Sequence, residues 1–236
     1  MTLRWPWSAD NELATSFVVI GCGRFGSAVC GELVRSGANV LAIDQSQKAI
    51  DDLQQQEPTL EARVVDGTDE EALRAAGVLD VGTVVVAIGT PIEASITATL
   101  IVKDSQGSQV RQVIARATSD LHEKMLSRVG ADRVVFPSKM QGLRLGQELV
   151  RPNLLERLPI DACNSIEEIR VPEAFIGRSL GELNLRKDYN VSVLAVGPPH
   201  QLMVNPTAAH VLKANDLMVV MGPCDVLAGL SGPRRR

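Results

Sequence analysis

Aromatic side chains are scarce in this 236-residue chain, at 3% of the sequence, although hydrophobic residues make up 45% of it. The core must therefore consist mainly of Val, Leu, Ile and Ala, which suits parallel strands buried on both faces. No apolar run approaches the length of a membrane-spanning helix. The segment 1–16 also lacks the continuous apolar core of a signal peptide. A mean hydropathy of +0.07 instead predicts a globular protein.

Basic residues are neither in excess nor concentrated, because 24 Lys and Arg face 28 Asp and Glu along the chain. Nucleic-acid binding requires a concentrated basic surface, so we expect no nucleic-acid partner. The cysteines Cys22, Cys30, Cys163 and Cys224 show no CxxC spacing, and the three histidines do not cluster. We therefore expect no metal site and no disulfide framework. Reduced thiols in the cytosol fit this pattern best.

Strand and helix patterns alternate along the chain from Phe17 to Pro137. Strands are predicted at 17–21, 39–44, 62–67, 83–89, 111–117 and 132–137. Helices are predicted between them at 24–37, 47–56, 69–77, 91–107 and 119–130. This alternation predicts an α/β fold with a Rossmann-type, doubly wound parallel sheet.

The pattern changes after Pro137. Apolar residues at helical spacing over 138–151 predict a helix, which either connects two domains, serves as a dimer arm or packs on its own domain. Beyond Pro152 we expect a small α+β C-terminal lobe. Its predicted elements are a strand at 164–172, a short helix and loop at 177–190, a hairpin at 191–206 and a last strand at 216–222. The predicted domains are thus 15–137, a connector helix at 138–152, and 153–236.

Gly21, Gly23 and Gly26 form a G-x-G-x-x-G frame between a predicted strand and a predicted helix. The first glycine permits a tight turn, the second lets phosphates approach the backbone, and the third lets helix and strand pack closely. Asp44 ends the next strand, where a carboxylate can accept hydrogen bonds from ribose hydroxyls. This combination predicts an adenine-nucleotide site, with a structural turn that binds no ligand as the alternative.

Arg24 stands inside this glycine turn. A guanidinium matches phosphate oxygens, so Arg24 favours ATP and ADP over NAD, unless it points to solvent. Ligands bind outside the carboxyl ends of parallel strands. The segments 66–68, 87–90 and 116–118 follow other strands and should line the same crevice. There Arg116 would supply a second positive charge, unless it is a surface arginine of an edge strand.

No catalytic constellation accompanies this crevice. The histidines form no Ser/His/Asp or Cys/His arrangement, and Cys22 is best interpreted as a small apolar filler between two glycines. Only the segment 153–236 follows the nucleotide-binding region and the predicted connector, which leaves little room for a substrate domain. We therefore expect a binding protein and not an enzyme.

Five motifs, in order and at family spacing, resemble the RCK (regulator of K⁺ conductance) domain. They are VVIGCGRFGSAVC, VLAID, DGTDEEALRAAG, VVVAIGTPIEAS and GADRVVFPSK. The sequence is most similar to the cytosolic gating subunits of Ktr-type potassium uptake systems, and the resemblance extends from residue 15 through the C-terminal lobe.

The resemblance implies a regulatory subunit located in the cytoplasm at the inner face of the cell membrane. Such subunits form intertwined homodimers through the connector helix and assemble into octameric rings. The ring lies beneath a membrane potassium channel subunit of the KtrB or TrkH type. ATP favours the conducting state of the channel and ADP the inactive state.

The resemblance also implies the nucleotide contacts. Its arginine in the glycine turn contacts the terminal phosphate across the dimer, which corresponds to Arg24. The implied contact residues are Gly21, Gly23, Arg24, Phe25, Gly26, Asp44, Gln45, Ser46, Asp66, Gly67, Ile88, Gly89, Thr90, Arg116, Ala117, Thr118 and His122. In some relatives the small lobe binds cyclic di-AMP at a dimer interface.

Three features depart from the Ktr pattern: two single residues and one pair. Ser138 stands where a glutamate usually helps to hold a cation, and Arg116 stands where a lysine is usual. The pair Asp66–Gly67 resembles Trk-type relatives, which are associated with NAD(H). The alternatives are therefore a Trk-like sensor of NAD/NADH and a Rossmann oxidoreductase.

Overall fold

The computed structural model describes residues 16–231. The predictions that fall on 1–15, including the absence of a signal peptide, and on 232–236 lie outside this range. The chain divides into two compact units between Lys139 and Met140. Each unit is described by itself.

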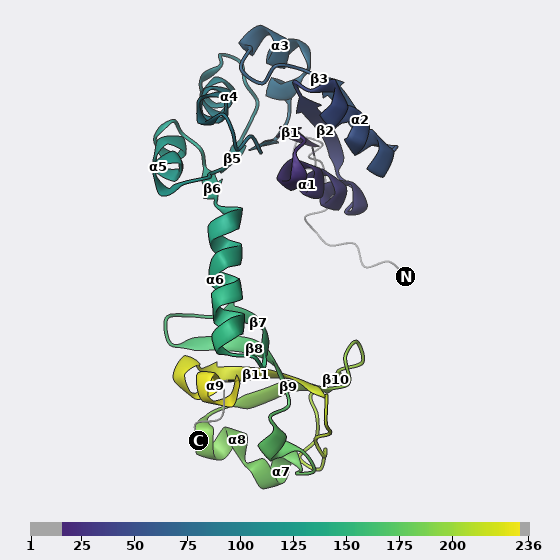
Figure 1. The fold of residues 1–236 in the computed structure, drawn as a ribbon, viewed down its shortest axis with the longest axis vertical. Helices are drawn as coiled ribbons and strands as arrows, with labels where there is room; N and C mark the ends of the chain where they lie inside the picture. The colour runs from purple at the N-terminus through teal and green to yellow at the C-terminus, as the bar shows by residue number, and fades with distance from the viewer. Residues whose placement is uncertain (1–15, 232–236) are drawn as a thin grey trace. The chain divides into compact units, whose positions relative to one another are not determined.

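A six-stranded parallel sheet forms the N-terminal unit (Figure 1). Its strands are β1 (Ser16–Ile20), β2 (Asn39–Asp44), β3 (Glu61–Val64), β4 (Thr83–Val86), β5 (Gln112–Arg116) and β6 (Arg133–Val135). The spatial order is β3-β2-β1-β4-β5-β6, so the order reverses between β1 and β4. This is the predicted Rossmann-type sheet, and the fold class is confirmed.

Helices cover both faces of this sheet. They are α1 (Arg24–Arg35), α2 (Gln47–Gln56), α3 (Glu70–Ala75), α4 (Ile92–Asp104) and α5 (Asp120–Arg128), with a 3₁₀ turn, η2 (Val78–Asp80). On one face, Cys30 of α1 and Leu53 of α2 join a buried aliphatic cluster. On the other face, Leu73, Val102 and Leu126 bring α3, α4 and α5 into a second cluster. Both cores are aliphatic, as the composition predicted.

A five-stranded antiparallel sheet forms most of the C-terminal unit, in the order β10-β9-β11-β8-β7. Its strands are β7 (Leu154–Pro159), β8 (Asn164–Arg170), β9 (Ser192–Gly197), β10 (Met203–Val204) and β11 (Leu217–Pro223). Its helices are η3 (Glu173–Phe175), α7 (Leu180–Leu183), α8 (Leu185–Tyr189) and α9 (Cys224–Ser231). The small α+β lobe is thereby confirmed.

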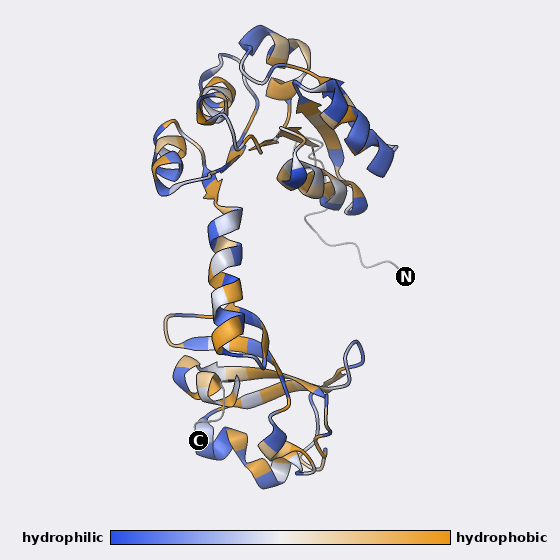
Figure 2. Ribbon diagram, viewed as in Figure 1, coloured by the Kyte–Doolittle hydropathy of each residue, from blue (hydrophilic) through white to orange (hydrophobic). Residues whose placement is uncertain are grey.

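The helix α6 (Pro137–Val150) contains the division between the units. Hydrophobic and polar stretches alternate along it (Figure 2), and none of its side chains is buried. Met140, Leu143, Leu145 and Leu149 are each more than half exposed. Within residues 16–231 these four apolar side chains are therefore left largely open to solvent.

The structure corrects three element predictions. The last strand of the parallel sheet ends at Val135, and Pro137 begins α6 instead of closing the strand, because proline suits the first helical turn. β7 and α9 were not predicted from the sequence. Among the described residues, no helix is long and apolar enough to cross a membrane, and no group of three or more metal-ligating side chains gathers.

Candidate functional site

A cavity of about 320 Å³ opens at the carboxyl ends of the parallel strands in the N-terminal unit. It lies where the strand order reverses between β1 and β4, which is where open α/β sheets bind ligands. We call this cavity the crevice. Its lining residues are Ile20, Gly21, Gly23, Asp44, Gln45, Val65, Asp66, Gly67, Thr68, Ala87, Ile88, Gly89, Thr90, Pro91, Ala94, Arg116 and Thr118.

The glycine turn fits its predicted roles residue by residue. Gly21 has a φ of +100°, a region that favours glycine, and its N–H donates to the carbonyl of Ile43 at 2.7 Å. A Cβ on Gly26 would lie 1.9 Å from the carbonyl oxygen of Gly21. A Cβ on Gly23 would meet no atom within 4 Å. Gly26 is therefore required by the packing of the protein, whereas Gly23 leaves space beside the backbone for a ligand.

Asp44 is held in place by the backbone around it. Its Oδ2 accepts from the N–H of Cys22 at 2.7 Å, and its Oδ1 accepts from the N–H of Ser46 at 2.8 Å. Both carboxylate oxygens are thus oriented and retain lone pairs for further donors. This preorganised acceptor is suited to the hydroxyl groups of a ribose.

Two helices begin at the crevice without a side-chain cap. The helices α2, α3 and α5 are capped by Ser46, Asp69 and Ser119, whose side chains each accept from a backbone N–H. In contrast, α1 and α4 follow Gly23 and Pro91 and have no side-chain cap. Uncapped N–H groups and the positive end of the helix dipole attract anions. The two uncapped helices flank the strand reversal, where phosphates would bind.

Arg116 brings a positive charge to the same crevice. Within residues 16–231 its guanidinium forms no ion pair, its Nε is buried without a partner, and its Nη1 makes only a long contact of 3.5 Å with the carbonyl of Ala87. The guanidinium lies 5.6 Å from the centre of the Phe25 ring, a cation–π arrangement that positions it. Arg116 is therefore available to an anionic ligand.

Asp66 occupies the opposite side of the crevice, after β3. Its Oδ1 accepts from the N–H and the hydroxyl of Thr68, at 2.8 and 2.7 Å. These two hydrogen bonds lower the pKa of Asp66, because they stabilise the ionised carboxylate. The crevice thus has carboxylates at the β2 and β3 ends and a cation at the β5 end.

Eleven of the predicted contact residues line the crevice: Gly21, Gly23, Asp44, Gln45, Asp66, Gly67, Ile88, Gly89, Thr90, Arg116 and Thr118. Six do not: Arg24, Phe25, Gly26, Ser46, Ala117 and His122. The predicted contact set omitted the lining residues Ile20, Val65, Pro91 and Ala94, and also Thr68 and Ala87. Thr68 and Ala87 belong to strand-end segments that were expected to face the crevice, whereas the helix phase that turns Ala94 inward is not visible in a sequence motif.

Arg24 lies in a neighbouring cavity of about 600 Å³ between α1 and α2. Ser46 and Arg35 line this cavity as well. Arg24 is exposed and forms no ion pair within residues 16–231, whereas Arg35 pairs with Glu32 at 2.8 Å. Arg24 therefore lines this second cavity and not the crevice of its own chain.

His122 of α5 is fully buried, next to Thr118 of the crevice wall. Its Nδ1 accepts from the N–H of Thr118 at 3.3 Å, and burial lowers its pKa. The imidazole therefore stays neutral and holds Thr118, which lines the crevice. His122 thus lies behind Thr118 and does not itself line the crevice.

We expect the N-terminal unit to lose stability as the pH falls below 6.5. Unfolded His122 takes up a proton near its ordinary pKa of 6.5, whereas the folded imidazole, with its lowered pKa, resists protonation. The unfolded state then binds more protons, so the free energy of unfolding decreases with decreasing pH. Urea unfolding at a series of pH values gives the slope of the free energy of unfolding against pH. This slope should be smaller in His122→Gln and unchanged in His200→Asn, which replaces an exposed histidine. Equal slopes in the original protein and both variants would contradict the prediction.

Two family models match the chain. The model of the TrkA-N domain matches residues 17–137, and the model of the TrkA-C domain matches residues 166–230. The chain is 33% identical over 206 residues to the Ktr system potassium uptake protein C of Bacillus subtilis, covering 87% of this chain and 91% of that protein. It is also 33% identical over 212 residues to the Ktr system potassium uptake protein A of Vibrio alginolyticus, covering 90% and 94%.

Solved structures share the fold. The GsuK channel superposes with a TM-score of 0.69 at 19% identity, covering all of this chain and 42% of the longer one. The isolated GsuK RCK domain gives a TM-score of 0.65 at 19% identity and covers 99% of this chain and 50% of that one. At this identity the similarity concerns the fold alone.

Proposed function

The chain belongs to the family of potassium-uptake proteins built from TrkA-N and TrkA-C domains, and on this premise we propose that it is a regulatory subunit that binds ATP and ADP and thereby gates a membrane potassium channel. The family confirms the resemblance that the sequence motifs predicted. Relatives named for potassium uptake, matched over nine-tenths of their length, support the transport role. The subunit acts from the cytoplasm and reaches the membrane through its channel partner.

The observation that carries the nucleotide proposal is the polarity of the crevice. Asp44 at the end of β2 offers carboxylate oxygens to a ribose, and the uncapped starts of α1 and α4 offer N–H groups to phosphates. Arg116, at the end of β5, is three strands away from β2, or roughly 14 Å at the usual strand spacing. A nucleotide with its ribose at Asp44 therefore extends its phosphates toward a cation that lacks an anionic partner in the described part of the chain.

Arg24 extends this proposal to a second copy of the chain. It lies outside its own crevice, exposed and without an ion pair among the residues that the structure describes. The resemblance places the corresponding arginine on the terminal phosphate across a dimer. We therefore assign Arg24 to the γ-phosphate bound by the partner subunit, so that ATP and ADP favour different arrangements of the pair.

The exposed apolar residues of α6 support a dimer. Four of them, Met140, Leu143, Leu145 and Leu149, are between 56% and 75% exposed. Met140 and Leu143 are three residues apart and Leu145 and Leu149 four, so each pair lies on one side of the helix and exposes an apolar surface that marks an interaction site. We propose that α6 of a second copy of the chain covers these residues. In a ring of such dimers, the free energies of nucleotide binding would add over the subunits. Moving a gate from mostly closed to mostly open takes about 5 kcal/mol, which several bound nucleotides can share.

Two alternatives to ATP and ADP follow from the sequence. The pair Asp66–Gly67 is of the Trk type, and a solved GsuK structure with the same fold is bound to NAD. An NAD(H) sensor would use the same crevice and the same channel partner. An oxidoreductase would add turnover of a substrate. Binding of cyclic di-AMP by the C-terminal unit stays a prediction from the family resemblance.

Titration calorimetry of the purified chain with ATP, ADP, NAD and NADH tests the proposal. Arg24→Ala should weaken ATP binding by roughly 10-fold to 100-fold, because a hydrogen bond to a charged group contributes about 1.5–3 kcal/mol. ADP binding should change much less, since ADP lacks the γ-phosphate. Arg35→Ala is the matched control, because Arg35 lines the same cavity but is paired with Glu32.

The opposite pattern would reject the proposal. If NADH binds more tightly than ATP and Arg24→Ala changes neither affinity, Arg24 has no part in ligand binding. A Trk-like NAD(H) sensor then becomes the better description. Turnover of NADH in the presence of a substrate would point to an enzyme.

A further inference from the structure

Two of the four cysteines are neighbours at one end of the five-stranded sheet. The register of β8 and β11 pairs Asn164 with Pro223, so the next residues, Cys163 and Cys224, are opposite each other. The N–H of Cys224 donates to the carbonyl of Cys163 at 2.7 Å. Opposite residues of an antiparallel pair have Cα atoms about 4.5–5.5 Å apart, and Cys163 and Cys224 continue this pairing one residue beyond β8 and β11. A disulfide spans roughly 4.4–6.8 Å between Cα atoms, so this pair lies within its reach.

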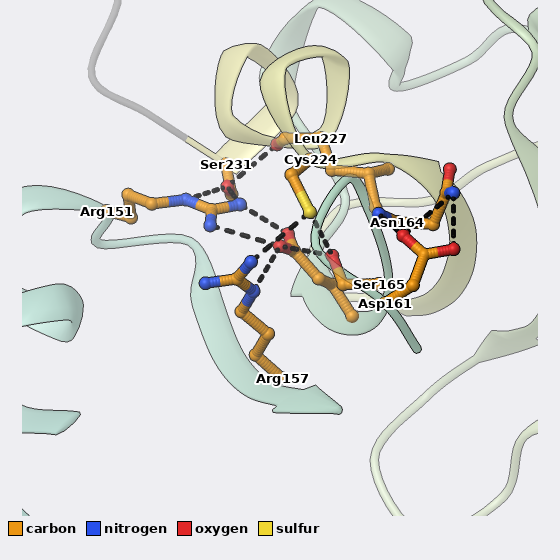
Figure 3. Close-up of polar contacts among 9 residues, drawn as sticks. Arg151, Arg157, Asp161, Asn164, Ser165, Cys224, Leu227 and Ser231 are labelled. Carbon is orange, nitrogen blue, oxygen red and sulfur yellow. Dashed lines mark hydrogen bonds and ion pairs between the residues drawn. The ribbon is translucent and has the colours of Figure 1, made fainter. Parts of the chain in front are cut away.

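The pairing register favours the same face for the two side chains. Cys163 directly precedes β8, two residues before Ser165, and residues two apart along a strand point to the same side. The Sγ of Cys224 lies 3.6 Å from the hydroxyl of Ser165. Figure 3 shows the sulfur of Cys224 directed toward Ser165 and Arg157, whose Nη2 donates to it at 3.2 Å. The sulfur of Cys224 is therefore held on the side of β8 on which Ser165 lies.

The turn that carries Cys163 is fixed by Asp161. The Oδ1 of Asp161 accepts from the N–H groups of Cys163 and Asn164, at 2.7 and 2.8 Å. Figure 3 shows Asp161 and Asn164 joined beside this end of the sheet. Cys163 is exposed and Cys224 is half-buried, so an oxidant in solution can reach the pair.

The other two cysteines, Cys22 and Cys30, differ from this pair in burial. Cys22 and Cys30 are buried in the aliphatic core beside α1, and burial raises the pKa of each thiol to about 12. The thiolate is the reactive form, so both are inert at neutral pH. They provide an internal control within the same chain.

We propose that Cys163 and Cys224 form a reversible disulfide when the chain meets a peroxide. Hydrogen peroxide oxidises the exposed thiol of Cys163 to a sulfenic acid and releases one water. The sulfur of Cys224 then attacks the sulfenic sulfur, the S–S bond forms, and the oxygen leaves with two protons as a second water. Two thiols and one peroxide thus give one disulfide and two waters. A thiol reductant reverses the reaction.

This bond would join two segments of the C-terminal unit that are distant in the sequence. Cys163 lies in the turn between β7 and β8, and Cys224 begins α9. The far end of α9 carries Ser231, which bonds with Arg151 directly after α6. Oxidation therefore constrains the part of this unit that adjoins the end of α6, and it should raise the unfolding temperature of the unit.

Peptide mapping of the full chain tests the proposal. The protein is treated with hydrogen peroxide, the remaining thiols are blocked under denaturing conditions, and tryptic peptides are analysed without reduction. We expect one cross-linked product that joins residues 158–170 to residues 214–234. Cys22 and Cys30 should carry the blocking group. The chain should migrate as a monomer on a non-reducing gel, and a reductant should restore four free thiols.

Single substitutions separate the intended bond from other oxidations. Cys163→Ser and Cys224→Ser should each abolish the cross-linked product and the rise in unfolding temperature. The proposal is overturned if peroxide converts Cys163 to a sulfinic acid while Cys224 stays free. It is also overturned if the only disulfide joins Cys163 of two chains, or if no disulfide forms.

Discussion

Replacing Gly23 by alanine is expected to weaken nucleotide binding strongly and to leave the fold intact. The backbone at Gly23 has φ −71° and ψ −176°, which any residue adopts, and a Cβ there meets no protein atom within 4 Å. The substitution should therefore change the free energy of unfolding by less than about 1 kcal/mol. The new methyl group would occupy the space through which phosphates approach the start of α1. We expect ATP affinity to fall at least tenfold, which is about 1.4 kcal/mol.

Gly26→Ala is the matched comparison, further along the same turn. Its Cβ would lie 1.9 Å from the carbonyl oxygen of Gly21 and 3.2 Å from the Cβ of Ala87. Neither group can move without opening the turn, so this variant should lose about 3 kcal/mol of stability, the upper part of what over-packing costs. Calorimetry measures the ATP affinity of both variants, and thermal unfolding measures their stability. Gly23→Ala should lower mainly the affinity, and Gly26→Ala mainly the stability. If Gly23→Ala binds ATP normally, the phosphates do not approach the turn at Gly23.

The parallel sheet could be predicted because its strands are short apolar runs and its helices follow recognisable signals. The strand 83–86 is a run of Thr and Val between turns, and α2, α3 and α5 begin at residues that cap helices. β7 could not be predicted in the same way. It is an edge strand in which only Leu154 is buried, and it ends in Pro159. α9 is also short, and it packs not only on the preceding β11 but also on β8, which is distant in the sequence.

The crevice could be predicted for a related reason. The carboxyl ends of parallel strands meet at one edge of the sheet, so Asp44, Asp66 and Arg116 could be placed together from their positions alone. The position of Arg24 depends instead on the phase of the first helical turn, which directs it to the cavity between α1 and α2. The burial of His122 likewise follows from the packing of α5 on the sheet. Motif spacing does not specify either orientation.

The ion pair that fastens the end of α6 to the C-terminal unit was not predicted from the sequence. Glu167 is fully buried, and its carboxylate accepts from both Nη atoms of Arg151, at 3.0 Å for Nη1. Arg157 and Ser165 contact the same carboxylate at 3.5 and 3.2 Å. Figure 3 shows Arg151 and Arg157 converging on this point from different segments. A sequence shows Glu167 only as an acid in a strand.

Glu167→Gln is therefore expected to destabilise the C-terminal unit by about 3–5 kcal/mol, because it leaves Arg151 with its charge unpaired in a largely buried position. Hydrogen exchange measured by mass spectrometry should show lost protection in β8 and α9 and unchanged protection in β1, β4 and β5. The matched control is Glu168→Gln, the next position along β8, because that side chain points to the other face and is only half-buried. It should change stability by less than about 0.5 kcal/mol. If both variants behave alike, the buried pair contributes nothing specific, and the end of α6 is held by packing alone.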